Sequence, residues 1–383
     1  MGQAVGLYLH IPFCQKKCDY CDFYSVPGGD ERAKQTYTKA LAAHLTETAP
    51  ALTRHTVDTV YFGGGTPPVL GLGPLHTLMD IIRRRFPLAA GAEITLEANP
   101  GVVDDKLLKK LRREGFNRLS LGVQSLEDDT LALLGRVHNA RQAQSAFEGA
   151  RAAGFDNIGV DLLYGLPGQT VEEWRATLRE IVAWGPEHIS CYGLKLEEGT
   201  PLWRDRADYA FPDDDAQADQ YLAAVSILEE NGYLHYEISN FARPGRVSRH
   251  NLKYWTLAPY IGLGPSACSD FGGRRWSYVR DLEAYVGGML GDGDVLHEME
   301  ELPPEARAAE YLMLRLRTAD GVSGNEYVRL YKGNFEPVER VLEARAAHGF
   351  ARSEGNRWRL TPKGFLVSNR IIADVLEART EGP

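Results

Sequence analysis

The sequence predicts an α/β protein: a parallel sheet with helices packed against it, followed by a small α+β domain. Two observations support this prediction. Short runs rich in β-branched and apolar residues alternate with helical patterns about six times in the first half of the chain. Cysteines and polar residues also cluster where these runs end, which is the edge at which parallel sheets carry their sites.

Six predicted strands and their helices follow one another in order. Each return to a parallel strand needs a crossover, and here each crossover shows apolar residues at helical spacing. Six units leave two arrangements open, an open doubly wound sheet or a barrel with fewer than eight strands. The predicted strands are residues 5–10, 56–62, 93–98, 118–122, 157–163 and 188–194, and the predicted helices are residues 37–45, 75–86, 104–114, 140–153 and 171–183.

The alternation stops after residue 196. Residues 211–215 combine a proline with three aspartates, which is typical of a loop that ends in a helix N-cap, and an amphipathic helix is predicted over 216–231. The next segment, residues 233–276, is rich in aromatic residues, and we expect it to be irregular.

A second break at residues 301–304 contains two prolines and begins the C-terminal part. That part is mainly helical, with a short strand, a turn and a final helix from about residue 357, which fits a winged-helix-like domain. Its positive and negative residues nearly balance, so we expect no DNA binding. The predicted divisions are residues 1–235 for the α/β core, 236–300 for a connecting segment and 301–383 for the C-terminal domain.

Charge and composition narrow the function classes. The 383 residues carry 43 Lys and Arg against 52 Asp and Glu, a net charge of −9, which argues against nucleic acid as a partner. We find no transmembrane segment and no secretory signal, although a transient membrane contact is compatible with the sequence. Five cysteines, three of them close together, are typical of ligands in a reducing compartment, so we expect a cytoplasmic protein.

The three clustered cysteines, Cys14, Cys18 and Cys21, follow the first predicted strand with C-x3-C-x2-C spacing. Three thiolates this close can bind one inorganic centre, and soft sulfur ligands favour iron–sulfur clusters, zinc or copper(I). A closed zinc site needs a fourth ligand, usually from a second cysteine pair, and the chain has none. We expect the two remaining cysteines, Cys191 and Cys268, to be buried and inert.

A glycine loop and several polar residues follow the later strands. The loop, residues 63–67, reads Gly-Gly-Gly-Thr-Pro, and glycines allow a backbone to approach a ligand closely. Alone, such a triplet is as typical of a tight βα turn. Carboxylates can bind ribose hydroxyls and Arg can bind a carboxylate. Further candidates on or after the predicted strands are Tyr8, Glu97, Gln124, Arg136 and Asp161.

The cysteine motif, with Tyr20 before its last cysteine, resembles the hallmark of the radical S-adenosylmethionine (radical SAM) superfamily, and the glycine loop resembles that superfamily's SAM-binding element. The resemblance implies that Cys14, Cys18 and Cys21 hold a [4Fe-4S] cluster and that SAM chelates the fourth iron. It also implies a partial (β/α)6 barrel as the fold of the core.

Longer matches cover most of the chain and are similar to the oxygen-independent coproporphyrinogen III oxidase group and its HemW relatives. They include residues 8–14, 121–125, 161–170 and 262–267. This resemblance implies that Tyr8, Gly64 and Glu97 contact the cluster-bound SAM. The residues that match the second SAM site of the oxidase are Gly65, Thr66, Gln124, Arg136 and Asp161.

Two features favour the HemW relatives over the oxidases. Phe23 stands two residues after Cys21, where oxidases resemble a C-x3-C-x2-C-x-C pattern, and the chain begins directly at the first strand. Residues 250–255, His-Asn-Leu-Lys-Tyr-Trp, look like the H-N-x-x-Y-W element of HemW, a haem-binding protein. His250 could coordinate haem iron, and the aromatic residues could pack on a porphyrin. The basic residues expected to meet haem propionates are Arg243, Arg246, Arg249 and Lys253.

The resemblance therefore implies a haem chaperone that carries a [4Fe-4S] cluster and SAM, binds haem and passes it to an acceptor protein. Neither the acceptor nor the oligomeric state is specified, and a homodimer is one option. Two alternatives remain: a radical SAM enzyme such as a coproporphyrinogen III oxidase, and a simple electron-transfer or zinc protein. No catalytic side chain is assigned.

Overall fold

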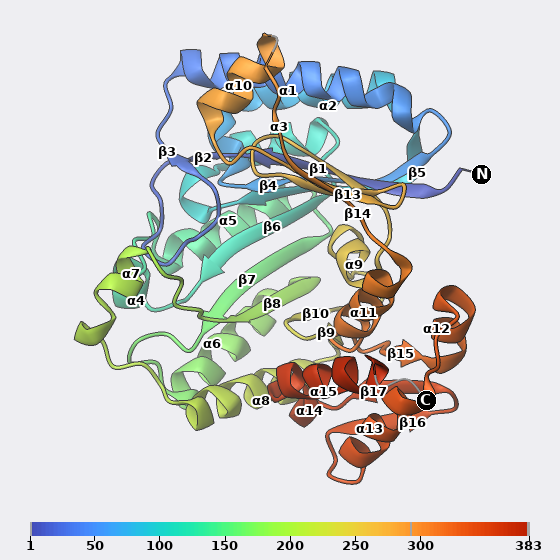
Figure 1. The fold of residues 1–383 in the computed structure, drawn as a ribbon. Helices are drawn as coiled ribbons and strands as arrows, with labels where there is room; N and C mark the ends of the chain where they lie inside the picture. The colour runs from blue at the N-terminus through green and yellow to red at the C-terminus, as the bar shows by residue number, and fades with distance from the viewer. Residues whose placement is uncertain (1, 292, 381–383) are drawn as a thin grey trace.

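The centre of the protein is a curved parallel sheet (Figure 1). The computed structural model describes residues 2–291 and 293–380. Six strands lie side by side in chain order and all pairs are parallel, so the prediction of six βα units is confirmed. The strands are β1 (Ala4–Ile11), β4 (Thr56–Gly64), β5 (Leu88–Ala98), β6 (Arg118–Gln124), β7 (Ile158–Tyr164) and β8 (His188–Gly193).

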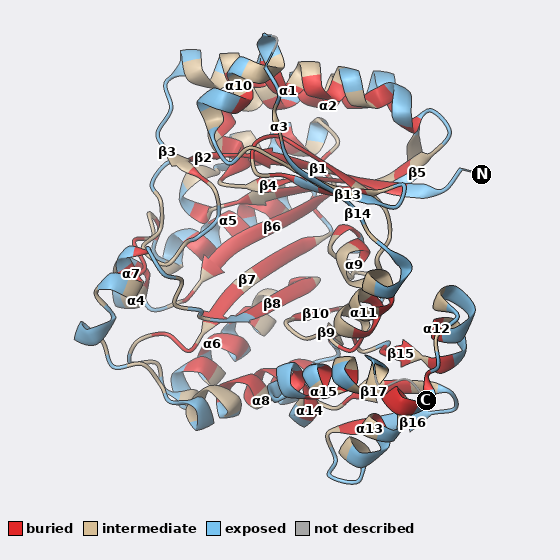
Figure 2. Ribbon diagram, in the orientation of Figure 1, coloured by how far each residue is buried: buried red, intermediate tan, exposed pale blue. Residues whose placement is uncertain are grey.

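Helices cover the convex face of this sheet, and buried residues run the length of the central strands (Figure 2). Each predicted helix forms, and its limits agree to within three residues except for the first, which begins six residues before its predicted start at residue 37. Asp30, Asp104, Asn139, Thr170 and Asp213 cap helices by accepting a hydrogen bond from a backbone amide in the first turn. No helix in the described part of the chain is both long and apolar enough to span a bilayer. The helices are α1 (Glu31–Thr48), α2 (Leu72–Arg85), α3 (Asp105–Arg113), α5 (Ala140–Ala152), α6 (Val171–Trp184) and α8 (Asp214–Glu230).

The two faces of the sheet differ in polarity. Leu119, Leu121 and Val123 of β6 are fully buried in the apolar core beneath the helices. The alternate positions of the same strand, Arg118 and Ser120, are buried but polar. The other strands repeat this alternation, which follows from the two-residue period of a β-strand. The concave face of the sheet is therefore a polar wall, whereas parallel strands covered on both faces usually read as continuous apolar runs.

Additional strands extend both edges of the sheet, which stays open between β14 and β9. β11 pairs parallel with β1, and the outer strands are antiparallel. The expectation that residues 233–276 are irregular is therefore wrong, because strands of three to five residues lack a detectable period. These elements are β9 (Leu234–Glu237), β10 (Asn240–Ala242), α9 (Arg249–Thr256), β11 (Tyr260–Leu263), β12 (Cys268–Phe271), β13 (Arg274–Tyr278), α10 (Leu282–Leu290) and β14 (Leu296–Glu301).

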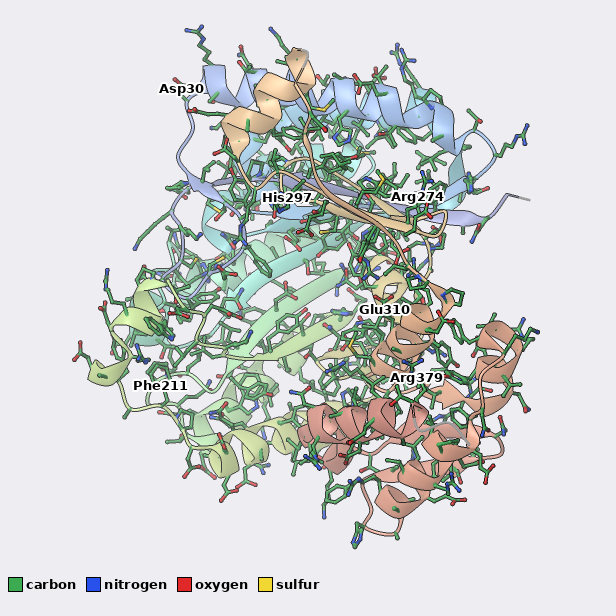
Figure 3. All side chains as sticks on the ribbon, in the orientation of Figure 1. Asp30, Phe211, Arg274, His297, Glu310 and Arg379 are labelled. Atoms are coloured by element: carbon green, nitrogen blue, oxygen red, sulfur yellow. The ribbon has the colours of Figure 1, made fainter. Side chains whose placement is uncertain are left out.

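The C-terminal part is a helical unit with a three-stranded sheet of order β15-β17-β16, in agreement with the predicted winged-helix-like domain. Glu310 on its first helix is labelled in Figure 3 and binds Arg275 of β13, which ties this helix to the main sheet. The predicted limits at residues 235 and 300 stay predictions, and residues 1 and 381–383 lie outside the described residues. The elements are α11 (Pro304–Arg315), β15 (Val322–Ser323), α12 (Gly324–Tyr331), α13 (Glu336–Ala346), β16 (Ala351–Glu354), β17 (Arg357–Leu360), α14 (Pro362–Leu366) and α15 (Ser368–Thr380).

Candidate functional site

A cavity of about 840 Å³ lies against the polar concave wall of the sheet. This volume is near the upper end of the range for small-molecule sites. Of the residues predicted to bind the cluster, SAM or haem iron, all except His250 line it. The lining residues among the predicted set are Tyr8, Cys14, Cys18, Cys21, Gly64, Gly65, Thr66, Glu97, Gln124, Arg136 and Asp161.

The three cysteines come from one short loop. Cys14 ends β2 (Phe13–Cys14), which pairs with β3 (Val26–Pro27), and Cys18 and Cys21 lie in the turn between these strands. The Cys21 amide donates to the Cys18 carbonyl oxygen at 3.2 Å, which holds the turn closed. The pairing of β2 with β3 thus brings all three thiols to the cavity wall.

A chain of hydrogen bonds connects two of the thiols through later strand ends. Thr66 Oγ1 donates to Cys14 Sγ at 3.6 Å, and Arg136 Nη1 donates to Cys18 Sγ at 3.4 Å. Between them Asn99 donates to Thr66 Oγ1 at 3.0 Å and accepts from Arg136 Nη2 at 2.7 Å. Asn99 was not predicted as a site residue, although it follows Glu97 by two positions. Donors to sulfur are a usual means of tuning a thiolate-bound centre.

The donor set fits an iron–sulfur cubane better than a single ion. Within the described residues, no three His, Cys, Asp or Glu side chains converge tightly enough to hold one metal ion. A cubane gives each thiolate its own iron, so its ligands surround a volume and do not converge on a point. Burial raises the pKa of Cys14 and of Cys21, which therefore must lose protons when a metal centre binds.

The glycine loop passes closely against neighbouring groups. Gly64 has a φ of +106°, and a Cβ there would lie 2.7 Å from the His10 ring. A Cβ on Gly65 would lie 2.7 Å from the carbonyl oxygen of Phe13. Glycine is required here by backbone conformation and by the closeness of the first strand and its loop. As a result the backbone of residues 64 and 65 faces the cavity without a side chain.

Glu97 lies beside this loop. Tyr61 donates to Glu97 Oε1 at 2.6 Å, and the Gly64 amide donates to Oε2 at 3.2 Å. Burial raises the pKa of Glu97 from 4.5 to about 7, and the two hydrogen bonds oppose that rise only in part. The side chain can therefore take either protonation state near neutral pH. Tyr61 was missed by the sequence reasoning because aromatic residues on a strand are normally core residues.

Asp161 and Gln124 complete the polar wall. Asp161 accepts hydrogen bonds from Ser190 at 2.6 Å and from Ser120 at 3.1 Å, and burial raises its pKa. Gln124 has a φ of +70°, which is uncommon for a residue other than glycine, and β6 and β7 shift register beside it. Such strained residues gather at binding sites, where the surrounding structure fixes a side chain in one direction.

His250 is fully buried at the edge of the cavity. Its ring nitrogens form hydrogen bonds with Thr59 Oγ1 and with the Tyr254 hydroxyl, both at 2.9 Å, and the ring stacks on Tyr61. Burial lowers the pKa of His250 to about 3, so the imidazole is neutral. Asn251, Tyr254 and Trp255 of α9 line the cavity in its place. The Tyr254 hydroxyl, one turn further along the same helix, is therefore the group that is hydrogen-bonded to Nε2 of His250.

Two expectations about nearby residues are wrong. Cys268 is exposed, although it lies at the start of β12, which is paired on both sides. The four basic residues expected to meet propionates do not line the cavity, and each bonds within the chain: Arg243 to the Asn231 carbonyl, Arg246 to Asp156, and Arg249 and Lys253 to Asp58. Cys191 is buried, as expected.

Comparison with known proteins gives the same family as these motifs. Residues 8–181 match the radical SAM superfamily, and residues 302–367 match the HemN C-terminal domain. The chain is 37% identical to the heme chaperone HemW of Mycobacterium tuberculosis, over 98% of this chain and 95% of that protein. It is 34% identical to the Escherichia coli heme chaperone HemW, over 96% and 97%.

Among solved structures, coproporphyrinogen III oxidase (HemN) from E. coli superposes with a TM-score of 0.85, at 24% identity, over 99% of this chain and 91% of that one. This likeness concerns the fold alone and confirms the predicted α/β core with a small C-terminal domain. The sequence relationship is closer and extends over nearly the whole length of the relatives. The chain therefore belongs to the HemW family of the radical SAM superfamily.

Proposed function

We propose that the protein is a haem chaperone that binds haem and delivers it to an acceptor protein, with a [4Fe-4S] cluster and SAM as its own cofactors. One observation carries this proposal. Asn251, Tyr254 and Trp255, from the element that looks like a haem-binding motif, line the same cavity as the three clustered cysteines. The names of the relatives support the same function. A cytoplasmic location belongs to the proposal, because free thiol ligands need a reducing compartment.

Each part of the wall has a role in this proposal. Cys14, Cys18 and Cys21 hold the cluster. Tyr8, Gly64 and Glu97 orient the cluster-bound SAM. When bound, the cluster and SAM supply one-electron chemistry that no side chain of this protein can supply. The residues proposed for a second SAM or for the cargo are Gly65, Thr66, Gln124, Arg136 and Asp161.

His250 is proposed as the haem contact, and the structure defines what this requires. The neutral imidazole is the form that coordinates iron. Its Nε2 is hydrogen-bonded to Tyr254, so coordination requires the Tyr254 side chain to move away. Tyr254→Phe removes the hydroxyl and keeps the ring, and we expect it to bind haem at least as tightly as the wild type. His250→Gln keeps a hydrogen-bonding side chain and should weaken haem binding while the cluster spectrum is unchanged.

The function is tested by titrating the anaerobically reconstituted protein with haem, with and without SAM, followed by transfer to an apo-haemoprotein. Saturable binding of about one haem per chain and transfer to the acceptor are the expected results. A parallel incubation with SAM, reductant and coproporphyrinogen III tests the alternative enzyme. Formation of protoporphyrinogen there, or no haem binding by the intact holoprotein, would reject the chaperone proposal.

A further inference from the structure

The cavity continues from the cysteine loop, at the carboxyl ends of the central strands, toward the amino-terminal ends of the same strands. Gln124 ends β6 at the cysteine side, whereas Arg118 begins the same strand, and both line the cavity. Six residues of strand span about 20 Å at about 3.3 Å each. His188, the first residue of β8, lines the same far end. The cavity thus has a thiol end and a second end at the start of the strands, which the sequence analysis did not identify.

Arg118 is the unusual residue at this second end. Its side chain is 1% exposed, and its Nε and Nη1 atoms have no hydrogen-bond partner. None of the ion pairs found between described residues includes it. A buried charge without direct partners is costly, and proteins normally pair such groups. A guanidinium that lines a cavity in this state is therefore suited to an anionic partner that enters the cavity.

Two acidic side chains lie near Arg118, but their carboxyl oxygens already accept hydrogen bonds from other groups. Both oxygens of Glu93 accept from the backbone amides of Arg249 and His250, at 3.1 and 3.0 Å. The oxygens of Asp161 accept from two serine hydroxyls. The charges of these carboxyl groups help to raise the pKa of Arg118 and keep its guanidinium protonated, but they accept no hydrogen bond from its N–H groups.

His188 adds a second group without a full set of partners. Its Nε2 forms a hydrogen bond with the Tyr236 hydroxyl at 2.7 Å, whereas its buried Nδ1 has no partner. Burial and the nearby Arg118 lower its pKa, so the ring is neutral and can carry its proton on Nδ1. Arg118 and His188 then present N–H donors to the same end of the cavity.

We propose that Arg118, assisted by His188, is the anchor for a carboxylate group of a ligand in this cavity. The carboxylate that we favour is a propionate group of haem, and this choice rests on the proposed function. The four basic residues first expected to meet the propionates are bonded elsewhere, which leaves Arg118 as the guanidinium in the cavity wall without a hydrogen-bond partner among the described residues. The other source of the same chemistry is the carboxylate of a second SAM molecule, because the cluster-bound SAM is expected at the thiol end. The fork of a guanidinium fits either group by paired hydrogen bonds.

The test compares haem with haem dimethyl ester, which lacks free carboxylates, on the reconstituted holoprotein. The variants are Arg118→Gln, Arg118→Lys and, as a control on the surface of α2, Arg84→Gln. We expect the wild type and the control to bind haem about 10- to 100-fold more tightly than the ester. Arg118→Gln should bind both with equal affinity, and Arg118→Lys should keep part of the preference. SAM affinity, measured in parallel, should be unchanged.

The other outcomes separate the sources. Loss of SAM affinity in Arg118→Gln, with the preference for the acid retained, supports the anchor with SAM as the carboxylate. A folded Arg118→Gln protein that keeps both the acid preference and SAM affinity overturns the proposal. If Arg118→Gln does not fold, the comparison of Arg118→Lys with the wild type decides. The proposal is also overturned if the wild type does not prefer haem to its ester and Arg118→Lys does not change SAM affinity. A wild type that binds neither haem nor ester refutes the chaperone function, and the SAM measurement still tests the anchor.

Discussion

The raised pKa of Glu97 predicts a pH-dependent stability difference that a single substitution reveals. Below about pH 4.5 the Glu97 carboxyl is protonated in both the folded and the unfolded chain. Between about 4.5 and 7 the unfolded chain loses this proton and the folded chain keeps it, so the free energy of unfolding falls as the pH rises. Above about pH 7 the whole penalty is present. Glu97→Gln removes this titration and keeps an oxygen that can accept from Tyr61.

The size of the effect follows from the shift. A rise from 4.5 to about 7 corresponds to about 3.5 kcal/mol at about 1.4 kcal/mol per pKa unit. Solvent in the cavity screens the group, so we expect about 2 kcal/mol in the apoprotein. Urea unfolding of the apoprotein should show Glu97→Gln about equal to the wild type near pH 4 and about 2 kcal/mol more stable near pH 8.

Two comparisons make this measurement specific. Burial also raises the pKa of Glu237 to about 7, but this group is present in both proteins and cancels in the difference. Glu148→Gln, on the exposed face of α5, should leave the pH profile unchanged. A stability difference for Glu97→Gln that is constant from about pH 4 to 8, or that has the opposite sign, would refute the assignment of a half-buried, partly neutral carboxyl.

Three further predictions concern the cysteine loop and its neighbours. Cys18→Ala should lose the iron and the cluster absorbance after anaerobic reconstitution, whereas Cys191→Ala should retain about four irons per chain, and a full cluster in Cys18→Ala would contradict its role. Gly64→Ala should lower the free energy of unfolding by about 1–3 kcal/mol, because residue 64 has a positive φ and its new methyl group would touch the His10 ring. Gly73→Ala, in open space on α2, should not lower it in the same denaturant titration. Asn99→Ala breaks the link between the two thiol-bonded side chains, so iron should be lost to a chelator several-fold faster; an unchanged rate would argue against that link.

The core of the fold could be predicted because its signal is local. Each of the six βα units contains a strand and a helix long enough to show its own period. The short strands β9 to β13 could not be predicted, because their three to five residues show no period of their own. They join the sheet where β10 pairs with β8 and β11 pairs with β1, and both of these partners lie far away in sequence. The same reasoning failed for Cys268, which is exposed at the start of one of these short strands.

The candidate site was predictable at one end only. Strand-end residues such as Glu97 and Asp161 stand out as polar groups within apolar runs. Arg118 and His188 begin their strands, where a polar residue is also typical of the preceding loop, so sequence alone gave no reason to select them. The hydrogen bond between Nδ1 of His250 and Thr59 depends on the packing of α9 against β4 and could not be inferred from the motif.

The alternation of side chains along the central strands gives each strand two independent tasks. Substitutions at every second position can alter which molecules are held without repacking the helices behind. Insertion of one residue into a strand, in contrast, would turn the ligand-facing side chains into the apolar core beneath the helices. The aliphatic side chains of that strand would then face the cavity. Natural variation along these strands should therefore consist of exchanges at inward positions, and length changes should be confined to the connecting loops.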